Sequence, residues 1–232
     1  MMSLFMIRVN MTDGLLPAGL QSTDFPQMMN DIEMCVTNLR EIPDDLDTKW
    51  PLGAIIQVEY SQLTSLSLAL TRLRPFFMFL TGNPITEIPP EVFEVDGMMY
   101  LGISEMNIHE LPQSVMVLSP SLNVVELDNT NISFYWSWMD ELVGRVDNPA
   151  LIVAGASPYC DDLKRIESGV QGVFSIPLSP EYSSILMNPS EDNRDALKRA
   201  VDCNFVDDGP YYPLALEDSR NALYALPSEI GS

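Results

Sequence analysis

The segment Met78-Phe79-Leu80-Thr81-Gly82-Asn83-Pro84-Ile85-Thr86-Glu87-Ile88-Pro89 decides the fold of this chain. Met78 and Leu80 are two positions apart, so on a short strand both point into the core while Phe79 points to the opposite face. Asn83 follows where the chain leaves the strand, and a buried amide there can bond backbone groups of neighbouring segments. The closing Ile-Pro favours an extended return path, because proline fixes φ and has no donor to satisfy. We interpret the segment as one strand, one turn and one return.

The same pattern recurs five times along the middle of the chain. Its fixed points, which we call anchors, are 24, 22, 23 and 24 residues apart by subtraction and comprise Leu39, Leu63, Ile85, Ile108 and Ile132. Apolar residues stand seven and five positions before each anchor: Ile32/Met34, Ile56/Val58, Met78/Leu80, Leu101/Ile103 and Val125/Leu127. This period lies within the roughly 20 to 29 residues typical of leucine-rich repeats. The sequence predicts an α/β fold, a short leucine-rich repeat solenoid of about five coils with parallel strands on the concave face.

Three regions follow from where the repeat begins and ends. Residues 1–30 are expected to be an N-terminal flank or degenerate coil, and residues 31–143 to hold the repeats. From Ser133, the residues Phe134, Trp138 and Leu142 share one helical stripe, which predicts a helix that caps the stack. Residues 144–232 lack the repeat and are expected to form an elaborated C-terminal cap with two short helices, at 161–169 and 190–201.

The charge of the chain limits its partners. Against 33 acidic residues it has 12 basic ones, a formal net charge of −21. Such a chain repels nucleic-acid phosphates and anionic membrane surfaces, so we expect neither as a partner. A basic protein or peptide fits this charge, although a merely solvated acidic surface is the simpler interpretation. The hydrophobic content of 46% is enough for a sizeable core.

Membrane insertion of this segment is not expected, since no stretch reaches the roughly 18 consecutive apolar residues that a spanning helix needs. The opening residues lack the features of a signal peptide. The expected location is therefore cytoplasmic if the chain is complete, and extracellular or membrane-attached if it is a fragment of a longer protein. Of the three cysteines, Cys160 and Cys203 could pair in an oxidising compartment, while Cys35 would lie on the open face of the first coil.

The sequence offers little for catalysis. His109 is the only histidine and follows an anchor on a return loop, where a solvated side chain is the simpler interpretation than a catalytic base. No cysteine or histidine pair has zinc-ligand spacing, the acidic clusters lack calcium-loop spacing, and no nucleotide-binding motif occurs. We therefore expect no enzyme, no metal and no cofactor.

The outward strand positions suggest a binding surface instead. Aromatic residues occupy its centre and carboxylates flank them on both sides, an arrangement typical of a peptide or protein site with an apolar anchor and an anionic rim. The candidate binding residues are Glu59, Phe79, Tyr100, Glu126 and Asp128. The competing interpretation is that the returning tail, with Tyr211, Tyr212 and Leu214, covers these aromatics within the same molecule. Trp136 is a further candidate for a partner contact, while Trp138 fits the cap better.

Several phrases of the chain resemble a group of oomycete leucine-rich repeat proteins. They are Leu39-Arg-Glu-Ile-Pro-Asp-Asp-Leu46, Thr48-Lys-Trp-Pro51, Gly82-Asn-Pro-Ile85, Asn131-Ile-Ser-Phe-Tyr-Trp-Ser-Trp-Met-Asp140 and Ser157-Pro-Tyr-Cys160. In that group Trp-Ser-Trp and a following cysteine segment recur after the last repeat, and many members look like C-terminal regions of longer membrane proteins. The resemblance implies the repeat fold and no catalytic residue.

Three functions remain as hypotheses. The first is a non-enzymatic recognition module or scaffold that binds a protein or peptide through the concave face. The second is the ectodomain or regulatory region of a membrane-associated sensor, for which Asn10-Met11-Thr12 and Asn131-Ile132-Ser133 would serve as glycosylation acceptors. A remote third is a hydrolase that uses the C-terminal segment.

Overall fold

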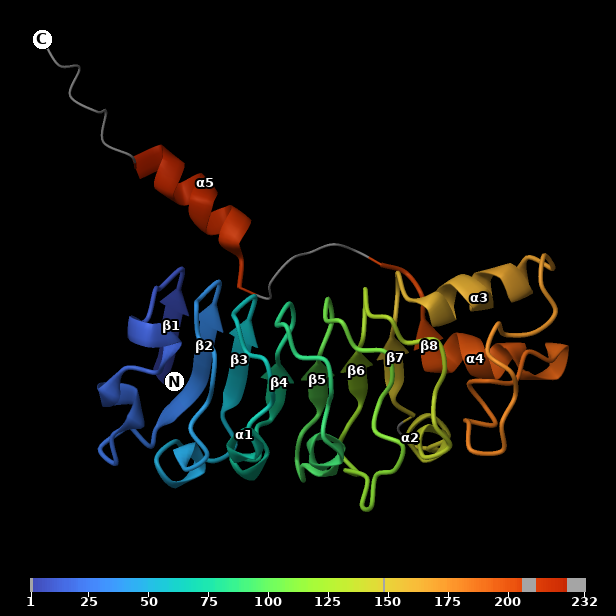
Figure 1. The fold of residues 1–232 in the computed structure, drawn as a ribbon, viewed down its shortest axis with the longest axis horizontal. Helices are drawn as coiled ribbons and strands as arrows, with labels where there is room; N and C mark the ends of the chain where they lie inside the picture. The colour runs from blue at the N-terminus through green and yellow to red at the C-terminus, as the bar shows by residue number, and fades with distance from the viewer. Residues whose placement is uncertain (1, 148, 206–211, 225–232) are drawn as a thin grey trace, which may run out of the picture.

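A single all-parallel sheet organises the chain in the computed structural model, which describes residues 2–147, 149–205 and 212–224. Its eight strands lie side by side in the order of the sequence (Figure 1). They are β1 (Met2–Ile7), β2 (Met29–Cys35), β3 (Ile55–Glu59), β4 (Phe77–Phe79), β5 (Tyr100–Gly102), β6 (Val124–Glu126), β7 (Leu151–Val153) and β8 (Val201–Asp202). The predicted α/β class with parallel strands is confirmed, and the arrangement is compatible with a solenoid.

The register of the sheet follows the predicted inward positions. Ile32 pairs with Ile56, Ile56 with Met78, Met78 with Leu101, and Leu101 with Val125. All five side chains are fully buried, and the five anchors are fully buried as well. Equivalent apolar residues of successive strands thus stack in rows, which buries one face of every strand in a common core.

Asn83 has the structural role that the sequence predicts. Its Nδ2 donates to the carbonyl oxygens of Val58 at 2.6 Å and Leu80 at 2.8 Å, and its Oδ1 accepts from the backbone N–H of Leu63 at 3.1 Å. Val58 and Leu63 belong to the preceding strand and its turn. One buried amide therefore satisfies backbone groups of two neighbouring segments where the sheet ends.

Each strand from β1 to β7 is followed, within three residues, by a residue of left-handed conformation that stands three positions before a buried residue. These residues are Arg8, Val36, Tyr60, Gly82, Glu105, Asn129 and Ala156. The pattern adds two anchors to the predicted five, Met11 at the start and Tyr159 at the end, and both are buried. The aliphatic pattern overlooks them because Gly14 stands three residues after Met11, and Tyr159 is aromatic. At Gly82 a Cβ would lie 2.6 Å from Cδ1 of Tyr60, so lack of space favours glycine in this turn. The positive φ alone does not require it, because the other six residues adopt it with side chains.

The sheet crosses both of the predicted regional boundaries. Residues 1–30 contribute β1, with Leu4 and Met6 packed against the core, and residues 144–232 contribute β7 and β8. The eight strands thus exceed the expected five coils. The spacing of apolar residues along the sequence does not predict β8, because this strand is only two residues long. It belongs to the sheet through its pairing with β7.

Two of the predicted helices lie close to their expected positions and one does not. α3 (Pro158–Glu167) and α4 (Arg194–Ala200) match the expected helices at 161–169 and 190–201. The helix expected from Ser133 begins instead at Met139, as α2 (Met139–Val143), and Ser133 does not cap it. The sheet continues past α2 into β7, so α2 packs along the stack rather than at its end (Figure 1).

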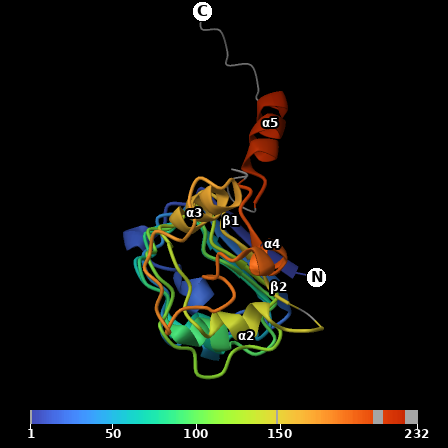
Figure 2. The same cartoon turned by 90° about the vertical axis from the view of Figure 1, so that its right-hand side faces the viewer.

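The remaining helical elements are short and belong mostly to the return segments. They are α1 (Leu68–Arg72) and the 3-10 turns Thr12–Gly14, Ala18–Gln21, Leu46–Thr48, Pro90–Glu94 and Glu191–Asn193. The exception is α5 (Leu214–Tyr224), which projects away from the rest of the molecule in the end-on view (Figure 2). Within the described residues, no helix is both long and apolar enough to span a membrane.

Candidate functional site

Three aromatic side chains form the centre of the open face, the face of the sheet opposite the core. Phe77 and Phe79 come from β4 and Tyr100 from β5. The ring centroids of Phe79 and Tyr100 lie 4.9 Å apart, and those of Phe77 and Tyr100 lie 6.2 Å apart. Phe79 is buried, while Phe77 and Tyr100 are half-buried. The cluster offers accessible ring surface beside a fixed, packed ring.

Gly102 explains why this cluster can pack so closely. A Cβ at Gly102 would lie 2.6 Å from Cδ1 of Phe79 and 3.4 Å from Oε2 of Glu126. Phe79 therefore leans across the space that the glycine leaves on β5, next to the Glu126 carboxylate of β6. Gly102 thus brings together two predicted binding residues, Phe79 and Glu126, from strands that are not adjacent.

Carboxylates border the aromatic cluster on the β6 side. Glu126 is half-buried, and Asp128 is only 9% exposed. Burial raises the pKa of Asp128 to about 6, the backbone of Gly155 opposes this by hydrogen bonding, and Glu126 and Asp202 raise it further. Oδ1 of Asp128 is buried and has no hydrogen-bond partner. An acceptor of this kind can receive a hydrogen bond from a cationic donor.

A second acidic group borders the cluster on the other side, at β2 and β3. Gln57 Nε2 donates to Oε1 of Glu33 at 3.2 Å, and Glu59 follows two positions after Gln57. Burial raises the pKa of Glu33 to about 7, helped by Asp31 and Glu59. The carboxyl groups of Asp31 and Glu33 share a hydrogen bond, while Oε1 of Gln57 is buried without a partner. The open face thus carries two groups of oxygen acceptors with aromatic rings between them.

The raised pKa of Glu33 predicts a pH dependence of stability. The folded protein holds this proton up to about pH 7, whereas the unfolded chain releases it near the ordinary pKa of 4.5. Between these values the folded state binds more protons, so the free energy of unfolding should fall as pH rises from about 4.5 to 7. Glu33→Gln should flatten this slope, measured by urea denaturation across the pH range, because glutamine stays neutral and can still accept from Gln57.

The matched control for this pH measurement is Glu41→Gln. Glu41 is exposed on a return segment, away from the acidic group. Its neutralisation should leave the slope between pH 4.5 and 7 as it is in the wild type. An unchanged slope in Glu33→Gln would show that Glu33 titrates alike in the folded and unfolded states.

The structure places the five predicted binding residues in two places. Phe79, Tyr100 and Glu126 meet at the centre of the open face, with Asp128 at the end of β6. Glu59 lies beyond them at the end of β3 and is only 2% exposed. The acceptors Asp31, Glu33 and Gln57 were not among the candidate binding residues, although period-two alternation places all three on this face.

The described part of the tail does not cover the aromatic cluster. Tyr212 packs against Phe5 of β1, with ring centroids 5.9 Å apart, and Leu214 is half-buried. Tyr211 lies outside the described residues. The tail was expected to cover the aromatic residues of β4 and β5. It lies instead near β1 and β2.

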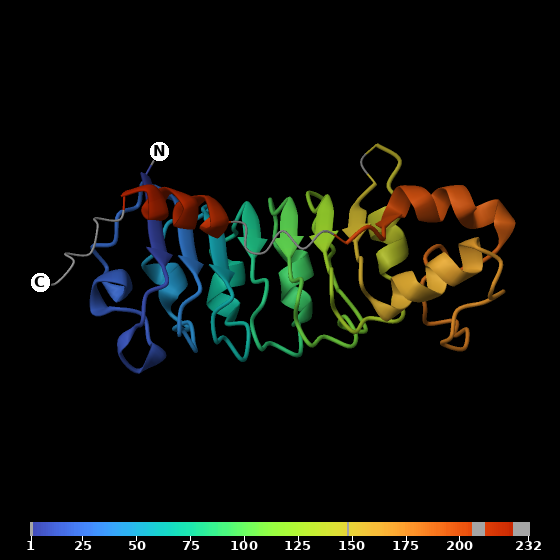
Figure 3. The same cartoon turned by 90° about the horizontal axis from the view of Figure 1, so that it is seen from above.

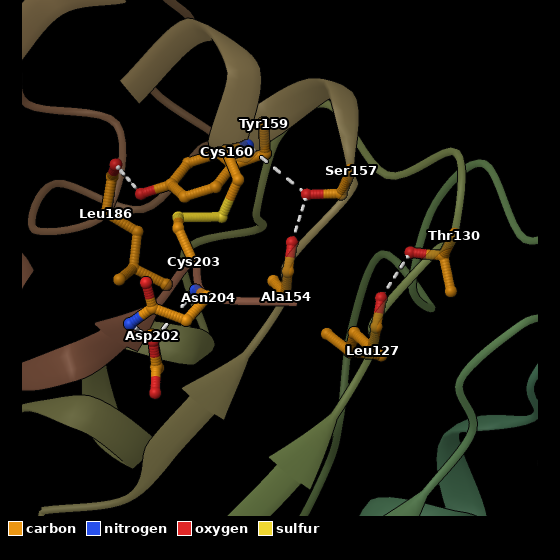
Figure 4. The surroundings of a disulfide bond; sticks show 10 residues. All are labelled: Leu127, Thr130, Ala154, Ser157, Tyr159, Cys160, Leu186, Asp202, Cys203 and Asn204. Carbon is orange, nitrogen blue, oxygen red and sulfur yellow. Dashed lines mark hydrogen bonds between the residues drawn. A yellow bond between two sulfur atoms is a disulfide. The ribbon is translucent and has the colours of Figure 1, made fainter. Parts of the chain in front are cut away.

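Cys160 and Cys203 form a disulfide that joins α3 to the segment after β8 (Figure 4). Their Cα atoms are 5.5 Å apart. Ser157 is the N-cap that precedes α3, and its Oγ donates to the carbonyl of Ala154 and accepts from the N–H of Cys160. After the preceding strand, Thr130 Oγ1 likewise donates to the carbonyl of Leu127, as Figure 4 shows. Cys35 is buried and unpaired, and burial beside Glu59 raises its pKa to about 12.

Of the other residues considered for function, the two tryptophans have structural contacts, whereas His109 is exposed. Trp136 and Trp138 donate their indole N–H groups to the carbonyls of Leu111 and Pro112, and Trp136 is 9% exposed. His109 is exposed beside a cavity of about 530 Å³ whose lining includes Glu87 and Trp136. Within the described residues no group of three or more His, Cys, Asp or Glu side chains is arranged to hold a metal ion.

No protein-family model matches the chain, and no curated protein matches it in sequence.

Proposed function

We propose that the chain is a leucine-rich repeat solenoid with an elaborated C-terminal cap, and that it is a non-enzymatic recognition module. The period of the anchors, the left-handed residue after each of seven strands and the Asn83 bonds support the repeat. The cap consists of α3, α4 and the disulfide beyond β7. Repeat solenoids present a broad sheet face to their partners, which directs attention to the open face.

The ligand that this face supports best is a basic protein or peptide. The observation that carries this proposal is a buried oxygen acceptor without a hydrogen-bond donor on either side of the aromatic cluster, Oε1 of Gln57 on one side and Oδ1 of Asp128 on the other. A lysine or arginine side chain supplies the missing donors and positive charge, and it can also lie on the face of an aromatic ring such as Tyr100. The net charge of −21 would speed the encounter with such a partner.

A binding titration with deca-lysine tests the proposal. At pH 8 the carboxylate of Asp128 is ionised, because its raised pKa is about 6. The double variant Glu126→Gln/Asp128→Asn should weaken binding about ten-fold, which corresponds to roughly 1.4 kcal/mol. The measurement is isothermal titration calorimetry at low salt, where electrostatic attraction is least screened.

The control variant removes the same charge from elsewhere on the surface. Glu87→Gln/Glu167→Gln changes two exposed carboxylates outside the open face and should alter the Kd by less than about two-fold, as expected for exposed charges. Equal losses in the two double variants would mean that deca-lysine senses only net charge. In that case the open face would not be the binding site.

The disulfide favours a second candidate, the ectodomain of a membrane-associated sensor, because disulfides persist in oxidising compartments. Asn10 and Asn131, in the two glycosylation acceptor triplets, are both exposed. A free-thiol count on protein isolated from its native compartment tests this candidate. One thiol per chain would support it, and three would oppose it.

A further inference from the structure

The beginning of α5 and the residues before it lie against the ends of the first strands. We call Tyr212–Asp218 the tail segment. Figure 1 shows that α5 begins beyond the ends of the first strands and extends away from the sheet, and in the view from above it overlaps these strands in projection (Figure 3). The guanidinium of Arg8, at the end of β1, donates through Nη1 and Nη2 to the two carboxylate oxygens of Asp218 at 2.5 and 2.8 Å. Together with the Tyr212 ring on Phe5, this ion pair attaches the tail to the sheet.

The tail segment brings negative charge to a face that is already acidic. The Glu217 carboxylate raises the pKa of Cys35, and Glu33 and Cys35 in turn raise the pKa of Tyr212, so these groups lie close to one another. Oε2 of Glu217 is buried without a hydrogen-bond partner. The tail therefore does not supply the donor that Gln57 Oε1 lacks, and it adds a further carboxylate, that of Glu217, beside Cys35.

The ion pair that attaches the tail segment to β1 is exposed to solvent and therefore weak. The side chains of Arg8 and Asp218 are 45% and 54% exposed, and exposed ion pairs contribute little to stability because water and salt screen them. Leu216 is 50% exposed, so the helix does not use this apolar side chain for docking. A covering segment that is held by one exposed ion pair and one ring contact can be displaced by a modest competing interaction.

We propose that the tail segment is an autoinhibitory cover over the acidic group of β2 and β3, and that a basic ligand displaces it. This inference rests on the proposed function of the open face. A cationic side chain would bond Oε1 of Gln57 and neutralise Glu33, which the tail does not do. Only molecules with an undocked tail then bind the ligand, so the apparent Kd equals the intrinsic Kd divided by the undocked fraction.

Asp218→Asn gives a test in which the two possible effects have opposite signs. Removal of one negative charge should by itself weaken the binding of deca-lysine. Release of the cover should strengthen it, by up to about five-fold, the factor that corresponds to an exposed ion pair. We expect the full-length Asp218→Asn chain to bind deca-lysine three- to five-fold more tightly than wild type at pH 8 and low salt. Asp161→Asn is the control, an exposed carboxylate on α3 whose loss should weaken binding slightly or not at all.

Hydrogen exchange provides a second measurement that does not depend on a ligand. The backbone amides of α5 should exchange faster in Asp218→Asn than in wild type, and faster in wild type once deca-lysine is added. If Asp218→Asn binds deca-lysine no more tightly than wild type, the cover is overturned while the proposed function stands. If none of the chains binds deca-lysine, the proposed function fails and the cover fails with it.

Discussion

Replacement of Asn83 by leucine should lower the free energy of unfolding by about 3 kcal/mol. Leucine fits the volume but leaves the Leu63 N–H and the Val58 and Leu80 carbonyls without the bonds that the amide makes. Each buried backbone group left unsatisfied costs about 1 to 3 kcal/mol. Urea denaturation followed by circular dichroism measures the loss, with wild type and variant compared at the same pH.

Two further substitutions show whether the loss comes from these bonds. Asn83→Asp keeps the acceptor for the Leu63 N–H but turns a second oxygen toward two carbonyls, so it should destabilise at least as much. Thr130→Val removes a single donor, that to the carbonyl of Leu127 at 2.8 Å, and should cost only about 1 kcal/mol. A loss below about 1 kcal/mol in Asn83→Leu would mean that water or a local shift satisfies the exposed backbone groups instead.

Removal of the disulfide should have an even larger effect. The bond closes a loop over a sequence separation of 43 residues, and the chain-entropy treatment gives about 4 kcal/mol for a loop of that length. The double variant Cys160→Ala/Cys203→Ala should therefore unfold at a markedly lower urea concentration than wild type. Because β8 is held by only two residues of pairing, we expect the loss to be concentrated in the segment from β7 to α4.

Cys35 supplies the control for this experiment. Its thiol is buried and lies outside the disulfide, so Cys35→Ala should keep the sensitivity of stability to reducing agents. The wild type should lose stability when dithiothreitol is present during unfolding, and the double cysteine variant should not respond. If oxidised and reduced wild type unfold at the same urea concentration, the disulfide does not stabilise this fold.

The sequence predicts the interior of this protein better than its surface. The five central strands, their inward residues and the role of Asn83 follow from spacing, because side-chain direction on a strand depends only on position along the chain. The two outer anchors escaped prediction since Gly14 and Tyr159 break the aliphatic pattern that identifies the others. The start of α2 at Met139 also escaped, because Phe134 packs against Tyr182 instead of sharing a helical stripe with Trp138 and Leu142.

The candidate site shows the same division. Alternation along the strands is enough to place Phe79, Tyr100, Glu126 and Asp128 on the open face. It does not show that Gly102 admits Phe79 toward Glu126, or that Glu59 is almost fully buried. Those facts depend on side chains from neighbouring strands, which lie roughly 4.8 Å apart in a sheet and yet more than 20 residues apart in this sequence.

By itself, the sequence determined which residues face inward, the phase of each central strand and the acidic character of the molecule, since these depend on local order and composition. Only the tertiary structure decided how many strands join the sheet, which carboxylates are buried enough to hold protons near neutral pH, and where the tail lies. The Arg8 to Asp218 ion pair joins residues 210 positions apart. Such a contact exists only because the parallel stack brings the end of β1 and the beginning of α5 to the same edge of the molecule.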